Sequence, residues 1–229
     1  MKLKNASILT MLLSAQVVLA QNAFQNLDFE QATIVPTGPE FLPYVEASPA
    51  LPGWIPYIGN TPSSAIVYDT ISIGSPTVSI HDSLSLLSSL VLQGNYSVII
   101  QHSVGGNPTT AAIGQTGQLP ADTVSLVFYT TPVSSLAGLD QLQVTFAGDA
   151  IPLFEISRTD KYSIVGGDIS AFASQTGELR FTALPTYGSF AIDHIQFSTQ
   201  AVPEPGTLAL LGLGGLLAGF VRWQVSRRK

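Results

Sequence analysis

Histidines and carboxylates are the side chains of this chain that could move protons or bind a metal. His81, His102 and His194 are far apart in the sequence, and none belongs to a metal-binding spacing such as His-x-His or His-Glu-x-x-His. His81 and Asp82 are adjacent, but neighbours on a strand point to opposite faces of a sheet and are not expected to act as a pair. With no cysteine, disulfides, thiolate metal sites and a cysteine nucleophile are excluded. We therefore predict no catalytic residue.

The acidic residues leave one enzymatic alternative open. Residues 21–202 contain 14 acidic residues and three basic ones, a net charge of −11. Two carboxylates that flank a sugar can hydrolyse a glycosidic bond, so a polysaccharide-acting hydrolase held at the cell surface is the alternative function. No nucleophile elbow, metal motif or cofactor fingerprint accompanies them, which favours a non-enzymatic protein. So acidic a surface repels phosphate backbones, and nucleic acid is not an expected partner.

The first 20 residues have the layout of a cleavable secretory signal. Lys2 and Lys4 precede an apolar stretch over 8–19, and Val18-Leu19-Ala20 obeys the small-residue rule for cleavage. We predict a signal peptide over 1–20, cut between Ala20 and Gln21. An amphipathic N-terminal helix is the alternative interpretation.

The C-terminal segment predicts a membrane span. Residues 207–221 carry no charge, and Trp223 follows at a position that suits the membrane interface. With its edges the stretch is just long enough to cross a bilayer, so we predict a transmembrane helix over 207–225. The basic tail at 226–229 should stay in the cytoplasm, which places the preceding domain outside.

The same C-terminal segment resembles the PEP-CTERM sorting signal of Gram-negative bacteria that make extracellular polysaccharide. The resemblance is carried by Val202, Pro203, Glu204 and Pro205, by the Gly-rich apolar span, and by Arg227, Arg228 and Lys229. It implies that an exosortase recognises the signal, removes the tail and passes the protein to the cell surface, outer envelope or exopolysaccharide matrix. A membrane anchor that is present only until processing fits this scheme, because the prolines keep the preceding backbone extended and open to an enzyme. A plain single-pass anchor with a Pro-rich stalk is the alternative.

Residues 21–198 are predicted to form one all-β domain, an antiparallel β-sandwich, with a Pro-containing linker over 199–206. Only 10% of residues are charged, and 20 Gly and 15 Pro suit short strands joined by turns. Segments with alternating apolar residues predict strands over 65–68, 77–80, 96–101, 123–129, 142–146, 153–156, 162–165, 177–182 and 190–197. Helical turns are expected only near 83–90 and 169–173. Gly166-Gly167-Asp168 predicts a turn, and 114–117 lacks the Lys of a phosphate-binding loop.

The edges of this domain resemble the galactose-binding-like jelly rolls found in many carbohydrate-binding modules. The matching segments are Asn26-Leu27-Asp28-Phe29-Glu30, Leu51-Pro52-Gly53-Trp54 and 190–197. The resemblance implies that the first and last strands pair, and that Glu30 and Asp193 are side-chain ligands of a structural calcium ion. His194 stands where the family often has an acidic residue. In the alternative, both carboxylates only satisfy backbone amides; no other cofactor is expected.

Sugar binding in such folds uses exposed aromatic rings, which makes extracellular polysaccharide a candidate partner beside the exosortase and the secretion machinery. Trp54, Tyr57, Tyr44 and Tyr68 are the available rings. Trp54 follows Pro52-Gly53, where the family's Trp commonly packs into the sandwich, so we favour a core role for it. The sequence identifies no binding face. It predicts an exported surface or exopolysaccharide-associated protein that is structural or interacts with carbohydrate.

Overall fold

The structure is a computed structural model that describes residues 23–39, 43–72, 74–103, 109–133, 138–185 and 188–202. The predicted signal peptide with Ala20 and Gln21 lies outside these residues, as do the predicted span at 207–225 and the tail at 226–229. Of the predicted sorting residues, Val202 is described, whereas Pro203, Glu204, Pro205, Arg227 and Arg228 are not. None of the helices within the described ranges has the length and apolar character needed to cross a membrane.

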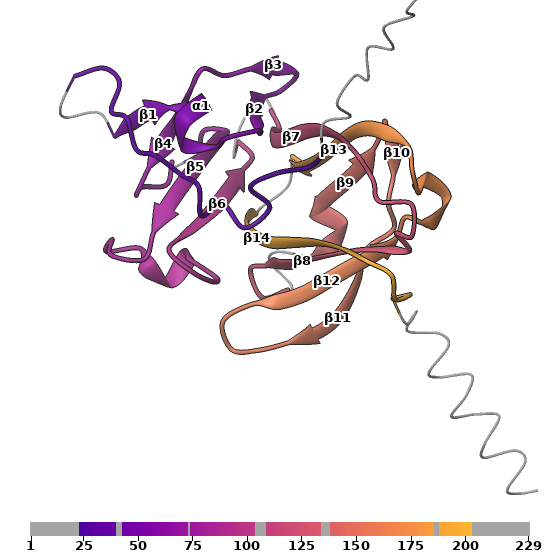
Figure 1. The fold of residues 1–229 in the computed structure, drawn as a ribbon. Helices are drawn as coiled ribbons and strands as arrows, with labels where there is room; N and C mark the ends of the chain where they lie inside the picture. The colour runs from indigo at the N-terminus through magenta and orange to yellow at the C-terminus, as the bar shows by residue number, and fades with distance from the viewer. Residues whose placement is uncertain are drawn as a thin grey trace, which may run out of the picture.

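The described residues form two β-sheets that face each other, as predicted for an all-β sandwich (Figure 1). In spatial order, the eight-stranded sheet contains β1 (Tyr44–Glu46), β4 (Ala65–Tyr68), β5 (Thr77–Asp82), β6 (Tyr96–Gln101), β14 (Ser189–Ser198), β8 (Ser125–Thr130), β12 (Ser163–Asp168) and β11 (Phe154–Arg158). The six-stranded sheet contains β10 (Asp149–Ala150), β9 (Leu142–Phe146), β13 (Thr176–Ala183), β7 (Ala111–Gln118), β2 (Ile55–Ile58) and β3 (Thr61–Pro62). Neighbouring strands are antiparallel except β4 and β5, which are parallel.

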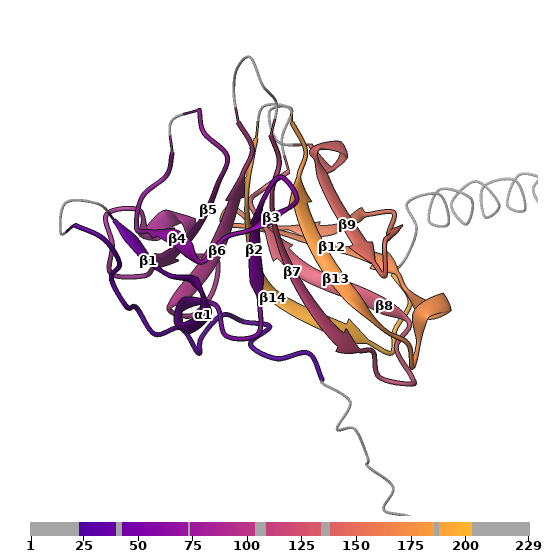
Figure 2. The ribbon, with the colours of Figure 1, turned by 90° about the horizontal axis from the view of Figure 1, so that it is seen from above.

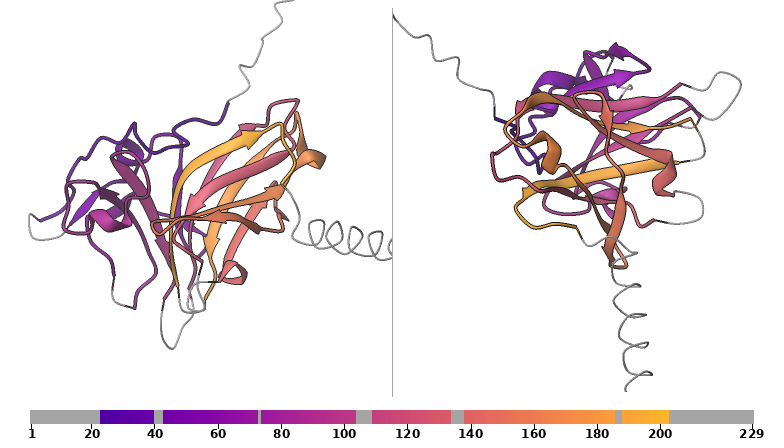
Figure 3. Two further views of the ribbon diagram at one scale, coloured as in Figure 1. Left: turned by 90° about the horizontal axis from the view of Figure 1, so that it is seen from below. Right: turned by 90° about the vertical axis from the view of Figure 1, so that its right-hand side faces the viewer.

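The chain crosses between the two sheets repeatedly. As a result, strands that are distant in the sequence lie side by side in one sheet. Seen from above, β1, β4, β5 and β6 lie at one end of the sandwich and β8, β9, β12 and β13 at the other (Figure 2). The last strand, β14, lies between β6 and β8 in the middle of its sheet, and its yellow end reaches the rim of the sandwich (Figure 3). Helical structure in the described residues is short: α1 (Ala47–Ala50), η1 (Ser88–Leu90), η2 (Leu139–Gln141) and η3 (Ser170–Phe172).

Aromatic rings connect the two sheets through the core. Trp54 lies 5.6 Å from Phe29 and 6.1 Å from Phe181 between ring centroids, and Phe181 lies 5.1 Å from Phe128. All four side chains are buried. Trp54 is 3% exposed, and its indole Nε1 donates a hydrogen bond to the carbonyl of Asn26 at 3.0 Å. The core role expected for Trp54 is therefore confirmed.

The N-terminal motif does not pair with the last strand in the way the resemblance implied. Phe29 has a positive φ of 58° in a turn, and its ring fills the core. This turn contacts β14 through a hydrogen bond from the Ile195 N–H to the Leu27 carbonyl, at 2.9 Å. The first strand of the described chain, β1, pairs instead with β4. The expected proximity of the two motifs is present, but a turn and not a strand provides it.

The predicted turn at Gly166-Gly167-Asp168 is wrong, because all three residues belong to β12. A side chain on Gly167 would lie 2.5 Å from the Pro152 carbonyl oxygen, and one on Gly166 would lie 2.7 Å from the Leu126 carbonyl oxygen. The glycines therefore allow close approach of the neighbouring backbone inside a strand, a role that a local turn pattern does not distinguish from chain reversal.

Candidate functional site

The outer side of the six-stranded sheet carries a set of polar side chains that we call the polar face. Their strand neighbours, such as Val144 and Phe181, belong to the core, so alternate residues point outward. The polar face consists of Tyr57 on β2, Thr116 on β7, Glu178, Arg180 and Thr182 on β13, and Gln143 and Thr145 on β9.

Strand register brings these side chains into rows across the sheet. One row runs from Tyr57 on β2 through Ala112 on β7 and Thr182 on β13 to Gln143 on β9. The next row contains Ile55, Gly114, Arg180 and Thr145. Because β7 contributes only Ala112 and Gly114 at the centre of these rows, larger side chains from β2 and β13 can lean over it.

Tyr57, Glu178 and Arg180 form a closed cluster over Gly114. The Tyr57 hydroxyl donates a hydrogen bond to Glu178 Oε1 at 3.0 Å, and the guanidinium carbon of Arg180 lies 4.0 Å from the centroid of the Tyr57 ring. Arg180 also donates to the Gly59 carbonyl at 3.2 Å and lies 3.9 Å from Glu178 Oε2. A Cβ at position 114 would lie 2.5 Å from Glu178 Oε1, so glycine is needed for this arrangement.

The electrostatics of the cluster favour the neutral form of the Tyr57 hydroxyl. Burial raises the pKa of Tyr57, the hydrogen bond to Glu178 and its charge raise it further, and the charge of Arg180 partly opposes this. The phenol therefore remains a neutral donor near neutral pH. The side chains of Arg180 and Glu178 are 20% and 35% exposed, so they are held in place yet reach solvent. Such pre-positioned donors and acceptors suit the recognition of a hydroxyl-rich ligand.

The polar face does not have the carboxylate pair of a glycosidase. Among the outward positions of β2, β7, β9 and β13, Glu178 is the one carboxylate, and Arg180 balances its charge. Glycoside hydrolysis of the common type needs two carboxyl groups on either side of the bond. The outward positions of these four strands do not supply that pair.

Glu30 and Asp193, the predicted calcium ligands, are brought to the same segment, which leads into β6. Glu30 Oε1 accepts hydrogen bonds from the N–H groups of Asn95 at 2.7 Å and Tyr96 at 3.0 Å, and Oε2 accepts one from Asn95 Nδ2 at 2.9 Å. Asp193 Oδ2 accepts from the Gln93 N–H at 3.0 Å. The two carboxylates therefore hold the chain reversal between η1 and β6.

Asp193 has two further donors and is almost completely buried. Its Oδ2 accepts from Ser97 Oγ at 2.6 Å, and its Oδ1 accepts from the N–H of His194 at 2.7 Å. Burial raises the pKa of the Asp193 carboxyl to about 6, although these hydrogen bonds act to lower it. The negative charge of Glu30 adds to the rise.

As they lie, these residues do not fit a calcium ion. Calcium takes six to eight oxygen ligands, whereas the carboxylates of Glu30 and Asp193 face N–H and O–H donors. No group of three or more His, Cys, Asp or Glu that could hold a metal gathers within the described part of the chain. The contacts correspond to the alternative in which the carboxylates satisfy backbone amides. Calcium binding itself stays a prediction for direct titration.

The three histidines have separate structural surroundings. His81 is buried and contacts Ser79 Oγ through Nε2 at 3.1 Å, whereas Asp82 accepts a hydrogen bond from the Tyr68 hydroxyl at 2.8 Å. His102 Nε2 accepts from the Gly188 N–H at 2.7 Å. The ring of His194, a residue at a positive φ of 49°, lies 4.6 Å from that of Tyr129. These contacts do not join the histidines into one site.

The chain that leads to the predicted sorting signal lies against the domain. Ser125 Oγ donates to the Gln200 carbonyl at 2.7 Å, and the Val124 N–H donates to the Ser198 carbonyl at 2.8 Å. Val202 Cγ2 lies 2.9 Å from the position that a Cβ on Gly166 would take. The chain from 199 to 202, predicted as the start of a linker, thus continues along β8 and β12.

Tyr57 is among the aromatic rings that the sequence offered as candidates, whereas its partners Glu178 and Arg180 are not. The available signal was the segment over 176–183, where Glu178, Arg180 and Thr182 alternate with Leu179 and Phe181. Alternation predicted this strand and indicates which of its residues point outward. It does not indicate that Tyr57, 121 positions earlier, lies beside Glu178.

Comparison with known proteins identifies the C-terminal motif and relates the fold to known structures. Residues 201–228 match the PEP-CTERM protein-sorting motif, which implies export and sorting to the cell surface. The curated proteins gave no match. The carbohydrate-binding module TmCBM61, solved in complex with β-1,4-galactotriose, is 15% identical with a TM-score of 0.40, covering 78% of this chain and 100% of that one. A family 11 carbohydrate-binding module from Clostridium thermocellum, solved with a β-1,3-1,4-mixed-linked tetrasaccharide, is 11% identical with a TM-score of 0.36, covering 67% and 92%. With TM-scores this low, these similarities identify no ligand for this chain.

Proposed function

We propose that this protein is a non-catalytic carbohydrate-binding protein of the cell surface, and that its polar face binds the carbohydrate. The cluster of Tyr57, Glu178 and Arg180 over Gly114 is the observation that carries the proposal. It offers a carboxylate and a guanidinium held at fixed positions at the solvent boundary, beside the uncharged side chains of Thr182 and Gln143. Sugar hydroxyls are both donors and acceptors, so they match such a surface.

A neutral polysaccharide is the proposed ligand. Residues 21–202 carry a net charge of −11, which repels a polymer of uronic acids. Arg180 is the one basic side chain among the outward positions of β2, β7, β9 and β13, and it is engaged with Glu178 and Tyr57. No unpaired cation of this face is therefore left for an acidic sugar.

The terminal segments supply the proposed route to the surface. A signal peptide over 1–20, cut after Ala20, takes the chain across the inner membrane through the secretion machinery. The helix over 207–225 then anchors it until an exosortase acts at the motif that contains Pro203, Glu204 and Pro205. The released domain remains with the outer envelope or the exopolysaccharide matrix, where its ligand is found. The sorting motif at 201–228 supports this route.

Affinity electrophoresis of the full-length protein tests the proposal, with neutral β-glucan, galactan or glucomannan cast in one set of gels and alginate in another. We expect retardation by at least one neutral polysaccharide, no retardation by alginate, and no release of reducing ends from either. Absence of retardation in every neutral gel would contradict carbohydrate binding. Release of reducing ends that disappears in Glu178→Gln would establish the hydrolase alternative instead.

A further inference from the structure

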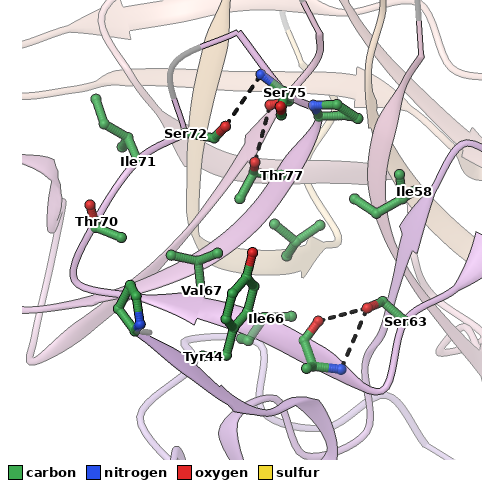
Figure 4. Close-up of a pocket in the computed structure, with 14 residues that line it drawn as sticks. Tyr44, Ile58, Ser63, Ile66, Val67, Thr70, Ile71, Ser72, Ser75 and Thr77 are labelled. Atoms are coloured by element: carbon green, nitrogen blue, oxygen red, sulfur yellow. Dashed lines mark hydrogen bonds between the residues drawn. The ribbon is translucent and has the colours of Figure 1, made fainter. Parts of the chain in front are cut away.

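A pocket lies away from the polar face, at the edge where the two sheets come together. We call it the edge pocket. It has a volume of about 400 Å³, which lies within the range of small-molecule sites. Among the described residues, its walls come from the start of β1, the end of β2, the residue that follows β3, and the strand β4. Residues 70–72 and 75–78, before and at the start of β5, complete them (Figure 4).

One side of the edge pocket is apolar and continuous with the core. Ile66 and Val78 line it and are almost fully buried, and Ile58 from the other sheet joins them. Tyr44 and Ile71 lie at the opening, with 42% and 46% of their surface exposed. An aromatic ring beside buried aliphatic groups offers a surface for the C–H face of a ligand.

The other side of the pocket carries hydroxyl groups. Several of them are held in place by hydrogen bonds with backbone groups. Ser63 Oγ donates to the Ala65 carbonyl at 2.7 Å, Thr77 Oγ1 donates to the Ser75 carbonyl at 3.1 Å, and Ser72 Oγ accepts from the Ser75 N–H at 3.2 Å (Figure 4). A hydroxyl that donates to a carbonyl still has lone pairs for a ligand donor. The Thr70 and Tyr44 hydroxyls make no hydrogen bond to another described residue, so they can donate.

The described residues that line the pocket carry no charge. The 14 residues that line it include no Asp, Glu, Lys, Arg or His, although residues 21–202 are strongly acidic overall. Taking a charged ligand out of water without a partner of opposite charge is costly, so an ionised ligand is disfavoured here. A ligand that fits has an apolar face, several hydroxyls and no charge.

From this combination we propose that the edge pocket binds a single neutral pyranose unit, as a site separate from the polar face. A pyranose has C–H groups on its faces for Tyr44 and Ile71 and hydroxyls at its rim for Thr70 and the serines. The polar face is an open sheet surface that suits a stretch of polymer, whereas a recessed pocket suits a chain end or a branch. The pocket therefore binds a different part of a polysaccharide from the part that the polar face binds.

Saturation-transfer NMR of the full-length protein tests this site with methyl β-D-glucopyranoside, methyl β-D-galactopyranoside and methyl α-D-mannopyranoside. We expect one of these glycosides to bind and Tyr44→Ala to weaken its binding about tenfold, because the ring contact is lost. Thr70→Val keeps the shape of the side chain and removes its hydroxyl, so we expect about fivefold weaker binding. Thr33→Val, at an exposed residue outside both the edge pocket and the polar face, is the matched control and should leave glycoside binding unchanged.

Several outcomes would overturn the proposal. They are binding of none of the three glycosides, binding that Tyr44→Ala and Thr70→Val leave intact, and binding that Tyr57→Phe reduces as strongly as Thr70→Val. If Tyr44→Ala does not fold, Thr70→Val still decides the question. Failure of this site leaves retardation by neutral polysaccharide unaffected, so it is distinguishable from failure of the polar face.

Discussion

The guanidinium carbon of Arg180 lies 4.0 Å from the centroid of the Tyr57 ring, although the two residues belong to strands that do not pair with each other. The strand between them, β7, has Gly114 opposite Arg180 and Ala112 opposite Tyr57, so both long side chains can reach across it. The same ring donates its hydroxyl hydrogen bond to Glu178. The geometry of the proposed carbohydrate-binding face thus depends on contacts that span three strands.

Tyr57→Phe is expected to weaken binding of the neutral polysaccharide about fivefold and to lower the free energy of unfolding by about 1 kcal/mol, because one hydrogen bond is lost while the ring contact remains. Affinity electrophoresis and urea unfolding measure the two effects. Tyr162→Phe, at the residue just before β12 of the other sheet, is the matched control and should not change the affinity. Equal affinity of Tyr57→Phe and the natural protein would argue against the polar face.

The substitution Gly114→Ala is expected to weaken polysaccharide binding while leaving the stability of the fold nearly unchanged. The new methyl group would meet Glu178 Oε1, the end of a flexible side chain, which can move away at small cost but then loses its bond to Tyr57. We expect a change in unfolding free energy of about 1 kcal/mol or less, together with about tenfold weaker polysaccharide binding. Isothermal titration and urea unfolding of the same preparation check this. Strong destabilisation with intact binding would be the opposite of the expected pattern.

The pKa of about 6 for Asp193 predicts greater stability in mild acid. A carboxyl whose pKa is raised above the usual 3.8 binds a proton in the folded state that the unfolded chain has released, so the free energy of unfolding falls as pH rises toward 6. Glu155 and Asp168 have lowered pKa values, through hydrogen bonds to Arg158 and Ser170, and their stabilising contribution is complete above about pH 4.5. Burial lowers the pKa of His81, so this group acts in the opposite sense below about pH 6.5. The contribution of Asp193 is therefore measured against Asp193→Asn.

Urea unfolding at a series of pH values measures this dependence. We expect the free energy of unfolding of the natural protein, relative to that of Asp193→Asn, to be about 1–3 kcal/mol higher at pH 4.5 than at pH 7. Asp193→Asn removes the titrating carboxyl and leaves the opposite contribution of His81 in place. A profile that Asp193→Asn leaves unchanged would show that another group is responsible.

Calcium titration decides between the two interpretations of Glu30 and Asp193. Because the carboxylate oxygens already accept hydrogen bonds, we expect calcium chloride to raise the melting temperature by no more than about 1 °C relative to EDTA. Calcium that binds only the folded state would raise it by several degrees. A rise of that size, lost in both Glu30→Gln and Asp193→Asn, would establish the calcium site.

Glu204→Ala tests the proposed processing at the C-terminus. In a host with an active exosortase, we expect surface protein of the natural sequence to lack Arg227, Arg228 and Lys229, and Glu204→Ala to retain them in the membrane fraction. Intact-mass spectrometry of the two fractions checks this. Glu178→Ala, which changes a carboxylate far from the motif, is the control. Surface protein that keeps the basic tail would indicate the plain anchor.

Local sequence patterns were sufficient to predict strands in which buried and exposed residues alternate. The predicted strands over 96–101 and 142–146 have the boundaries of β6 and β9, because alternation of apolar and polar residues reports which face of a strand is buried. The all-β class follows for the same reason. The sorting motif is likewise a linear pattern, and it was recognised without any structure.

Strand β7 could not be predicted from its own residues. It reads Ala-Ala-Ile-Gly-Gln-Thr-Gly-Gln, which is rich in small residues and lacks the alternation typical of a half-buried strand. It is a strand because β13 pairs with all eight of its residues and β2 pairs with four. Its small side chains then leave the space in which Tyr57 and Glu178 meet.

The sequence alone determined that the chain has a sorting signal, an alternating β domain and an acidic surface without cysteine, since each is a property of composition or of near neighbours. Only the tertiary structure decided which side chains act together. Tyr57 and Glu178 are 121 positions apart, and Glu30 contacts Asn95 across 65. Contacts between residues so far apart depend on strand order and register. Both result from packing of the whole core, so no local sequence pattern predicts these contacts.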